Sequence, residues 1–274
     1  MVVRLKSIPS MQKKNITFNQ INWKYFVQGK GDETVFMFPG GLRAPVYGGS
    51  FVKNLAKHFK IIIPVYPPIW NLKELIEGVN RILDQEKIQR VHLFGTSFGG
   101  LICQAFMVYS PHKTCKIILG NTGTVQSDPR FRRRMWQILF LIKILPAFIV
   151  RRIMIKAFTR IVPKNSPNYA EIVDLIRNHI QTKQLDKQEI ICHFKSLIFF
   201  QTELKLTHEI GRSFQDRMLI IYSDKDPGVD PNAFKFLKEM FPEAQYHQFI
   251  DGGHMPMIVF LEEFFNLVIN FLQS

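Results

Sequence analysis

One serine stands in a short glycine-rich turn between two segments of different character. The turn is Gly95-Thr96-Ser97-Phe98-Gly99-Gly100, with an apolar, β-prone run over 91–94 before it and a helical pattern over 101–105 after it. A Gly-x-Ser-x-Gly turn between a strand and a helix is typical of a nucleophile elbow. The glycines allow close backbone contacts that a Cβ atom would block. The segment therefore predicts that Ser97 is a nucleophile.

A serine hydroxyl needs a general base, and the base needs an orienting carboxylate. In a sheet that carries such an elbow, the acid and then the histidine follow the serine along the chain. His254 follows the last predicted strand in an Asp-Gly-Gly-His loop, at the same sheet edge as Ser97. The preceding strand ends in Asp224 and Asp226. We predict Asp226 as the acid because it stands directly before a Pro-Gly turn, and Asp224 is the alternative.

An oxyanion that forms on the substrate needs two N–H donors. The backbone of Phe98, next to the serine, is expected to supply one. The second is assigned to Gly41, because Pro39-Gly40-Gly41 follows the strand-like run 34–38 and lets the backbone approach closely. Each such donor contributes about 3 kcal/mol in the transition state. Two other histidines, His92 and His247, fall inside strand patterns and are expected to be structural.

Strands and helices are predicted to alternate along the chain. The strand-like runs are 22–28, 34–38, 60–65, 91–95, 115–120, 217–222 and 245–250, and the helical runs are 50–58, 71–86, 99–110, 231–241 and 257–272. Such alternation favours an α/β fold with a mostly parallel central sheet and helices on both faces. The carboxyl ends of parallel strands lie at one edge, where ligands bind in open α/β sheets.

One interval breaks the alternation. About a hundred residues separate Asn121 from Met218, although a crossover needs only about a dozen. The interval shows helical patterns over 131–145, 146–158, 168–181 and 187–200. We interpret it as an inserted helical cap over the carboxyl ends of the strands. The predicted division is 1–124 for the first part of the core, 125–210 for the cap and 211–274 for the second part of the core.

The positive charge of the chain is concentrated in this interval. The chain carries a net charge of +14, and residues 128–164 hold ten Lys or Arg and one acidic residue. Cations interleaved with bulky apolar side chains over 130–160 indicate either a solvated basic helix pair or peripheral contact with an anionic membrane. Nucleic acid is not expected, because the chain shows charge without a recognised binding motif.

Other features narrow the class of protein. The three cysteines, Cys103, Cys115 and Cys192, have no metal-like spacing and are expected to be reduced thiols in a cytoplasmic protein. No nucleotide-binding loop is present, so neither a cofactor nor a metal is expected. Residues 1–6 show no secretory signal pattern, and no run reaches the ~18 apolar residues of a spanning helix.

With these residues the chain resembles the α/β-hydrolase superfamily over nearly its whole length. The elbow at Ser97, Asp226 in an Asp-Pro turn and the terminal Gly253-His254 carry the likeness. A closer similarity is to the maspardin-like branch. It rests on the run Tyr66-Pro67-Pro68-Ile69-Trp70, on residues 91–97 and on Gly99-Gly100. Two positions depart from the superfamily pattern. Pro39-Gly40 replaces the usual His-Gly of the oxyanion loop, and Tyr66-Pro67-Pro68 replaces an Asp-x-x-Gly-x-Gly segment.

Two functions follow from this resemblance and from the residues. The first is a serine hydrolase of the carboxylesterase or lipase type, in which Ser97, Asp226 and His254 cleave a hydrophobic ester or thioester. The second is a non-catalytic interaction module on a hydrolase scaffold, because maspardins are regarded as interaction proteins without a good terminal histidine. This chain retains His254, which favours the enzyme.

Overall fold

The computed structural model describes residues 11–46, 49–125, 129–182 and 185–274. The prediction about residues 1–6 lies outside this part of the chain. The described residues form one eight-stranded sheet in the order β1-β2-β4-β3-β5-β6-β7-β8. β1 and β2 pair antiparallel, as do β2 and β4, and the remaining pairs are parallel. The strands are β1 (Gln12–Phe18), β2 (Ile21–Gln28), β3 (Thr34–Phe38), β4 (Lys60–Val65), β5 (Val91–Thr96), β6 (Thr114–Gly120), β7 (Met218–Ser223) and β8 (Gln245–Phe249).

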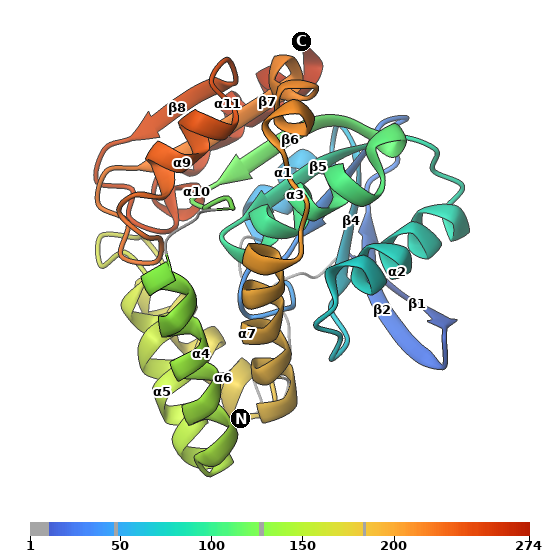
Figure 1. Ribbon diagram of the computed structural model, residues 1–274. Coiled ribbons are helices and arrows are strands. Elements are labelled where there is room, and N and C mark those ends of the chain that lie inside the picture. The colour runs from blue at the N-terminus through green and yellow to red at the C-terminus, as the bar shows by residue number, and fades with distance from the viewer. Residues whose placement is uncertain (1–10, 47–48, 126–128, 183–184) are drawn as a thin grey trace.

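Helices cover both faces of the sheet, as Figure 1 shows. One face carries α2 (Leu72–Gln85), α3 (Phe98–Tyr109) and α9 (Ala233–Met240), whose apolar side chains join one buried core. The other face carries α1 (Gly49–Leu55) and α11 (Leu261–Gln273), which bury a second core. Shorter helical pieces are η1 (Pro111–Lys113), α8 (His208–Arg212), η2 (Gln215–Arg217) and α10 (Pro256–Val259). The predicted α/β class and the sheet with two covered faces are confirmed.

The strand that the sequence analysis missed is β1. Its sequence, QKKNITF, has only two large apolar side chains, Ile16 and Phe18, and both remain partly exposed. An edge strand buries little of itself, so it carries charged side chains and lacks the apolar pattern of a central strand. The seven predicted strands all form, with their ends shifted by a residue or two.

Four of the helices between β6 and β7 form the helical insertion. They are α4 (Pro129–Ile144), α5 (Ala147–Arg160), α6 (Tyr169–Gln181) and α7 (Lys187–Thr202). The end of α7 packs into the core of the sheet, because Phe200 and the following Leu204 and Leu206 belong to the same buried cluster as α2 and α3. The bounds 125 and 210 stay a prediction. No helix among the described residues is both long and apolar enough to cross a bilayer.

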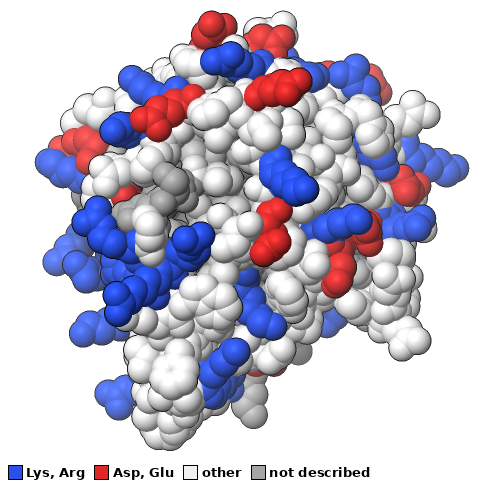
Figure 2. Space-filling view, viewed as in Figure 1, with Lys and Arg blue, Asp and Glu red and all other residues white. Residues whose placement is uncertain are grey.

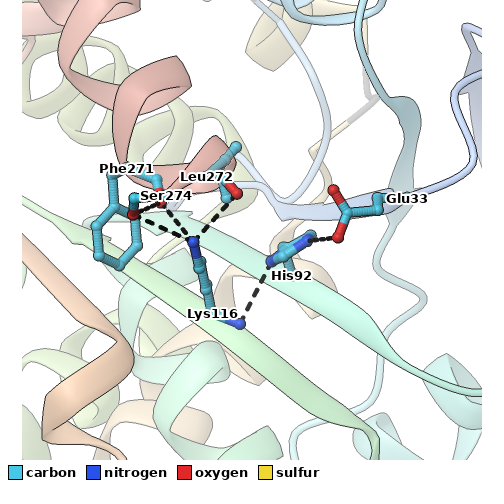
Figure 3. A network of polar contacts seen from close by, with 6 residues as sticks. All are labelled: Glu33, His92, Lys116, Phe271, Leu272 and Ser274. Atoms are coloured by element: carbon cyan, nitrogen blue, oxygen red, sulfur yellow. Dashed lines mark hydrogen bonds and ion pairs between the residues drawn. The ribbon is translucent and has the colours of Figure 1, made fainter.

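His92, near the start of β5, has the structural environment expected for it (Figure 3). Its Nε2 lies 3.3 Å from a Glu33 carboxylate oxygen, and its Nδ1 accepts the backbone N–H of Lys116 at 3.3 Å. The imidazole thereby satisfies an amide at the point where the register between β5 and β6 shifts. The Lys116 ammonium donates to the carbonyls of Phe271 and Leu272 and so ties the last turn of α11 to the sheet.

A buried carboxylate fastens the antiparallel edge of the sheet. Glu86, directly after α2, accepts hydrogen bonds from Lys14 of β1 and Tyr25 of β2, each at 2.8 Å, and pairs with Lys60 of β4 at 2.9 Å. Burial opposes ionisation, but these donors outweigh it and lower the pKa of Glu86 to about 2. One side chain therefore joins three strands to one helix.

We expect Glu86→Gln to lower the free energy of unfolding by about 2 kcal/mol, because three donors lose a charged acceptor. In the native protein this stabilisation is present above the ordinary pKa of 4.5 and is lost as the pH falls toward 2. Urea unfolding at neutral pH measures the loss. Glu77→Gln, on an exposed position of the same helix, is the control and should change stability by less than about 0.5 kcal/mol. Equal effects of both substitutions would contradict this account of Glu86.

Candidate active site

Ser97 lies between the end of β5 and the start of α3 in a strained conformation, with φ 55° and ψ −124°. Its N–H donates to the carbonyl of Gly120 at the end of β6 (2.8 Å), and its own carbonyl accepts the Thr122 hydroxyl (2.7 Å). The turn is so tight that a Cβ on Gly99 would lie 2.0 Å from the carbonyl oxygen of Phe38. The glycine of the motif is therefore required by the approach of β3, and the serine projects from the carboxyl edge of the sheet.

His254 and Asp226 meet at the same edge. The Nδ1 atom of His254 lies 2.7 and 3.0 Å from the two carboxylate oxygens of Asp226, and both side chains are buried. With an ionised carboxylate on this side, Nδ1 carries the proton and leaves Nε2 free to act as an acceptor. Gly228 borders the ring so closely that a Cβ there would lie 2.5 Å from Nδ1. The geometry thus fixes the position and the tautomer of the imidazole.

Asn121 supports this pair and was not singled out from the sequence. Its side-chain amide donates to the Asp226 Oδ2 atom at 2.8 Å and to the carbonyl of Gly253 at 3.1 Å, while the N–H of Gly228 donates to Oδ1 at 2.7 Å. Each carboxylate oxygen therefore has a donor besides the imidazole. The only signal in the sequence was the position of Asn121 directly after a strand, at the edge where polar loop residues gather.

The alternative acid, Asp224, lies elsewhere. Its Oδ1 atom accepts the backbone N–H of Asp251 at 2.8 Å, and the Asp251 carboxylate pairs with Lys225 at 2.6 Å. Asp224 is exposed and braces the loops after β7 and β8 against each other. Of the two aspartates, Asp226 is the one that contacts His254.

Ser97 and His254 line one cavity of about 310 Å³. Phe98 and Gly41, the two expected oxyanion donors, line it as well. The helical insertion supplies the opposite wall through apolar side chains, among them Met135 of α4, Met154 and Phe158 of α5, and Phe194 and Leu197 of α7. The cavity therefore places a hydroxyl and an imidazole in a chamber whose other walls are mostly apolar.

The two segments that depart from the superfamily pattern support each other. Residues 40–43 form a turn in which the Arg43 N–H donates to the Gly40 carbonyl at 2.9 Å. The guanidinium of Arg43 is buried and donates to the carbonyls of Pro67 (2.7 Å) and Ile69 (3.0 Å). A second hydrogen bond joins the same two segments, since the hydroxyl of Tyr66 donates to the carbonyl of Pro39 at 3.1 Å. The loop of Gly41 is thus held by the segment that follows β4, and the role of Arg43 was missed.

A second histidine, His193 of α7, also lines the cavity. Its ring lies against that of Phe98, with centroids 4.4 Å apart, and its Nδ1 is buried without a hydrogen-bond partner among the described residues. Burial and the nearby charge of Arg43 lower the pKa of His193 to about 3, so the ring is neutral at physiological pH. The sequence offered no signal for it, because it falls within a helical pattern without a motif.

Nothing in the described part of the chain groups three or more His, Cys, Asp or Glu side chains as a metal site would require. The polar groups of the cavity suit acyl-transfer chemistry. They comprise a hydroxyl on a strained turn, an imidazole oriented by a carboxylate, and backbone N–H groups at the start of a helix.

Comparison with known proteins agrees with this fold. The family model described as the alpha/beta hydrolase fold matches residues 67–261. Maspardin of Danio rerio is 25% identical over 227 residues, which cover 82% of this chain and 68% of that protein. A 2-hydroxy-6-oxononadienedioate/2-hydroxy-6-oxononatrienedioate hydrolase of Pseudomonas putida is 24% identical over 266 residues, 89% of each chain.

Solved structures share the fold at low sequence identity. A hydrolase from Pseudomonas aeruginosa superposes with a TM-score of 0.77 at 14% identity, over 96% of this chain and 99% of that one. A thermophilic esterase from Thermogutta terrifontis gives a TM-score of 0.75 at 16% identity, over 96% and 98%. These likenesses bear on the arrangement of the sheet and helices.

Because the folded protein keeps His193 neutral, its stability should depend on pH. The contribution of the neutral His193 to the free energy of unfolding is present above the ordinary pKa of 6.5. It is lost as the pH falls toward 3, at about 1.4 kcal/mol per pH unit. We expect His193 to account for about 2 kcal/mol of the stability lost between pH 7 and pH 5. In His193→Phe, which keeps a flat ring in the same place, this part of the loss should vanish.

Denaturant unfolding at the two pH values measures the difference. His208→Gln, at an exposed position, is the control and should keep the pH dependence of the unsubstituted protein. If His193→Phe loses as much stability on acidification as the unsubstituted protein, a neutral buried His193 is contradicted.

Proposed function

The chain belongs to the α/β-hydrolase family, and from this premise we propose that it is a serine hydrolase that cleaves a carboxylic ester through an acyl-enzyme on Ser97. One observation carries the proposal. The His254 imidazole is fixed on Asp226 at 2.7 Å and lines the same cavity as Ser97, a residue on a strained turn. A protein that used the scaffold only for binding would have no need of this pairing.

In the proposed reaction, the Ser97 hydroxyl attacks the carbonyl carbon of the ester while Nε2 of His254 accepts its proton. Asp226 stabilises the imidazolium that forms. The N–H groups of Phe98 and Gly41 donate to the oxyanion, and the alcohol leaves with the proton from His254. Water then attacks the acyl-enzyme, again with His254 as the base, and releases the acid.

The substrate is proposed to be hydrophobic at its acyl group. The cavity that Ser97 faces is walled by methionine, phenylalanine and leucine side chains of the helical insertion, which would bury an aliphatic or aromatic acyl chain. These apolar walls support an activity of the carboxylesterase or lipase class, with thioesters as chemically related substrates.

A fluorophosphonate probe tests the role of Ser97 directly, because it reacts with an activated serine and leaves a stable adduct. We expect the purified protein to be labelled and Ser97→Ala to show no labelling, with unchanged circular dichroism. Thr96→Val, next to the serine, is a control that should remain labelled. A folded protein that resists the probe would support the alternative of a non-catalytic, maspardin-like interaction module.

Hydrolysis of p-nitrophenyl esters tests the acid. We expect Asp226→Asn to lower kcat by about 10³–10⁴-fold, because the imidazole loses the partner that sets its tautomer. Asp224→Asn is the matched control at the neighbouring aspartate and should lower kcat by less than about tenfold. A series of esters of rising chain length reports the acyl preference, and a rise in kcat/KM with length is expected. Equal losses in both variants would contradict the assignment of Asp226.

A further inference from the structure

Large apolar side chains are exposed mainly on α4 and α5. Among the described residues, six of the eight exposed side chains of this kind lie on these two helices, each at least half exposed: Trp136, Phe140, Leu141, Ile144, Phe148 and Ile153. Apolar patches on soluble proteins are usually small, and a concentrated one marks a contact surface.

The spacing gathers most of these α4 side chains on one side of that helix. Trp136, Phe140 and Ile144 are four residues apart, so they form a single stripe along α4. Phe148 follows on the first turn of α5, after a connection of only two residues. We call the six exposed apolar residues, with the cations that border them, the outer face of α4–α5.

The inner sides of the same helices are already filled. Met135, Leu139 and Ile142 of α4 are buried, as are Val150 and Met154 of α5. Both helices thus have apolar side chains on two sides, and only one side packs against the protein. The apolar side that is left uncovered indicates a contact surface.

Cations surround the exposed stripe. Residues 129–160 contain nine Lys or Arg and no Asp or Glu. Arg132 lies one turn before Trp136, Lys143 lies beside Ile144, and Arg152 lies one turn after Phe148. These three have no carboxylate within ion-pair distance in the described part of the chain. Figure 2 shows Lys and Arg side chains gathered on the side of the molecule where α4 and α5 lie in Figure 1.

We propose that the outer face of α4–α5 docks on an anionic lipid bilayer. Headgroup phosphates would pair with the cations, while the aromatic and aliphatic side chains would enter the boundary between headgroups and acyl chains. A second copy of the chain fits less well, because two faces with nine cations and no acid repel each other. A nucleic acid would satisfy the charges but leave the apolar stripe in water.

Docking in this orientation brings the cavity of Ser97 close to the membrane. The inner sides of both helices line that cavity, through Phe131 and Met135 of α4 and Met154 and Phe158 of α5. The same two helices would therefore contact lipid on one side and the cavity on the other. The docking itself rests on the outer face alone and does not depend on the proposed hydrolysis.

Co-sedimentation with vesicles tests the proposal. The protein should pellet with vesicles that contain about 30 mol% phosphatidylserine in phosphatidylcholine, and much less with phosphatidylcholine alone. Raising the salt to about 0.5 M should weaken binding at least about tenfold, since the attraction is partly screened. The fluorescence of Trp136, which is 54% exposed, should shift to the blue in the bound protein and lose this shift in Trp136→Phe.

Two variants separate the contributions. Phe140→Ser with Ile144→Ser removes apolar anchors, and Arg132→Glu with Arg152→Glu reverses two charges. Each pair should weaken binding at least about tenfold. Ile250→Ser is the matched control, because Ile250 is 60% exposed but lies after β8, outside this face. Ser97→Ala should bind vesicles like the unsubstituted protein, so a failure of docking and a failure of hydrolysis can be told apart.

Three results would overturn the proposal. The first is no pelleting of the folded protein with anionic vesicles at low salt. The second is binding that neither variant pair reduces more than Ile250→Ser does. The third is a change of oligomeric state in the Phe140→Ser, Ile144→Ser variant without any vesicle binding by the unsubstituted protein, which would identify a second copy as the occupant.

Discussion

The backbone at Ser97 holds a left-handed conformation that residues with a side chain rarely adopt, and the ends of the surrounding strands are what maintain it. Such a conformation costs about 1–3 kcal/mol, which must be supplied by the rest of the fold. Here β6 accepts the N–H of Ser97, Thr122 donates to its carbonyl, and β3 presses against Gly99. The sheet with its two buried faces is the support for that one turn.

Those parts of the site that depend on local pattern could be predicted from the sequence. The strand, glycine turn and helix around Ser97 lie within residues 91–109, and Asp226 and His254 stand in the loops that follow β7 and β8. Asn121 contacts Asp226 across 105 positions, and no spacing encodes such a contact. The path of the loop after β7 likewise decides which of the two aspartates contacts the histidine. Asp224 and Asp226 are only two residues apart, and the sequence does not show that path.

The fold shows the same division between local and distant information. Central strands are apolar on both faces and were easily predicted, whereas β1 depends on pairing with β2 and on the distant Glu86 that binds Lys14. His193 lies in a helix with no motif, so only its burial against Phe98 brings it to the cavity. The net charge of +14 became informative once its cations were found to cluster on α4 and α5, because these helices also line the cavity of Ser97.

Arg43 carries a charge into the interior, where solvent hardly screens it, and that charge acts on the cavity through more than the loop it holds. Its field already disfavours a proton on His193. The same field would favour an anion in the chamber, both the oxyanion of the proposed attack and the carboxylate that the proposed hydrolysis would leave. The buried arginine that would stabilise the oxyanion of the proposed reaction would therefore also oppose the departure of the acid product, because that product leaves as an anion.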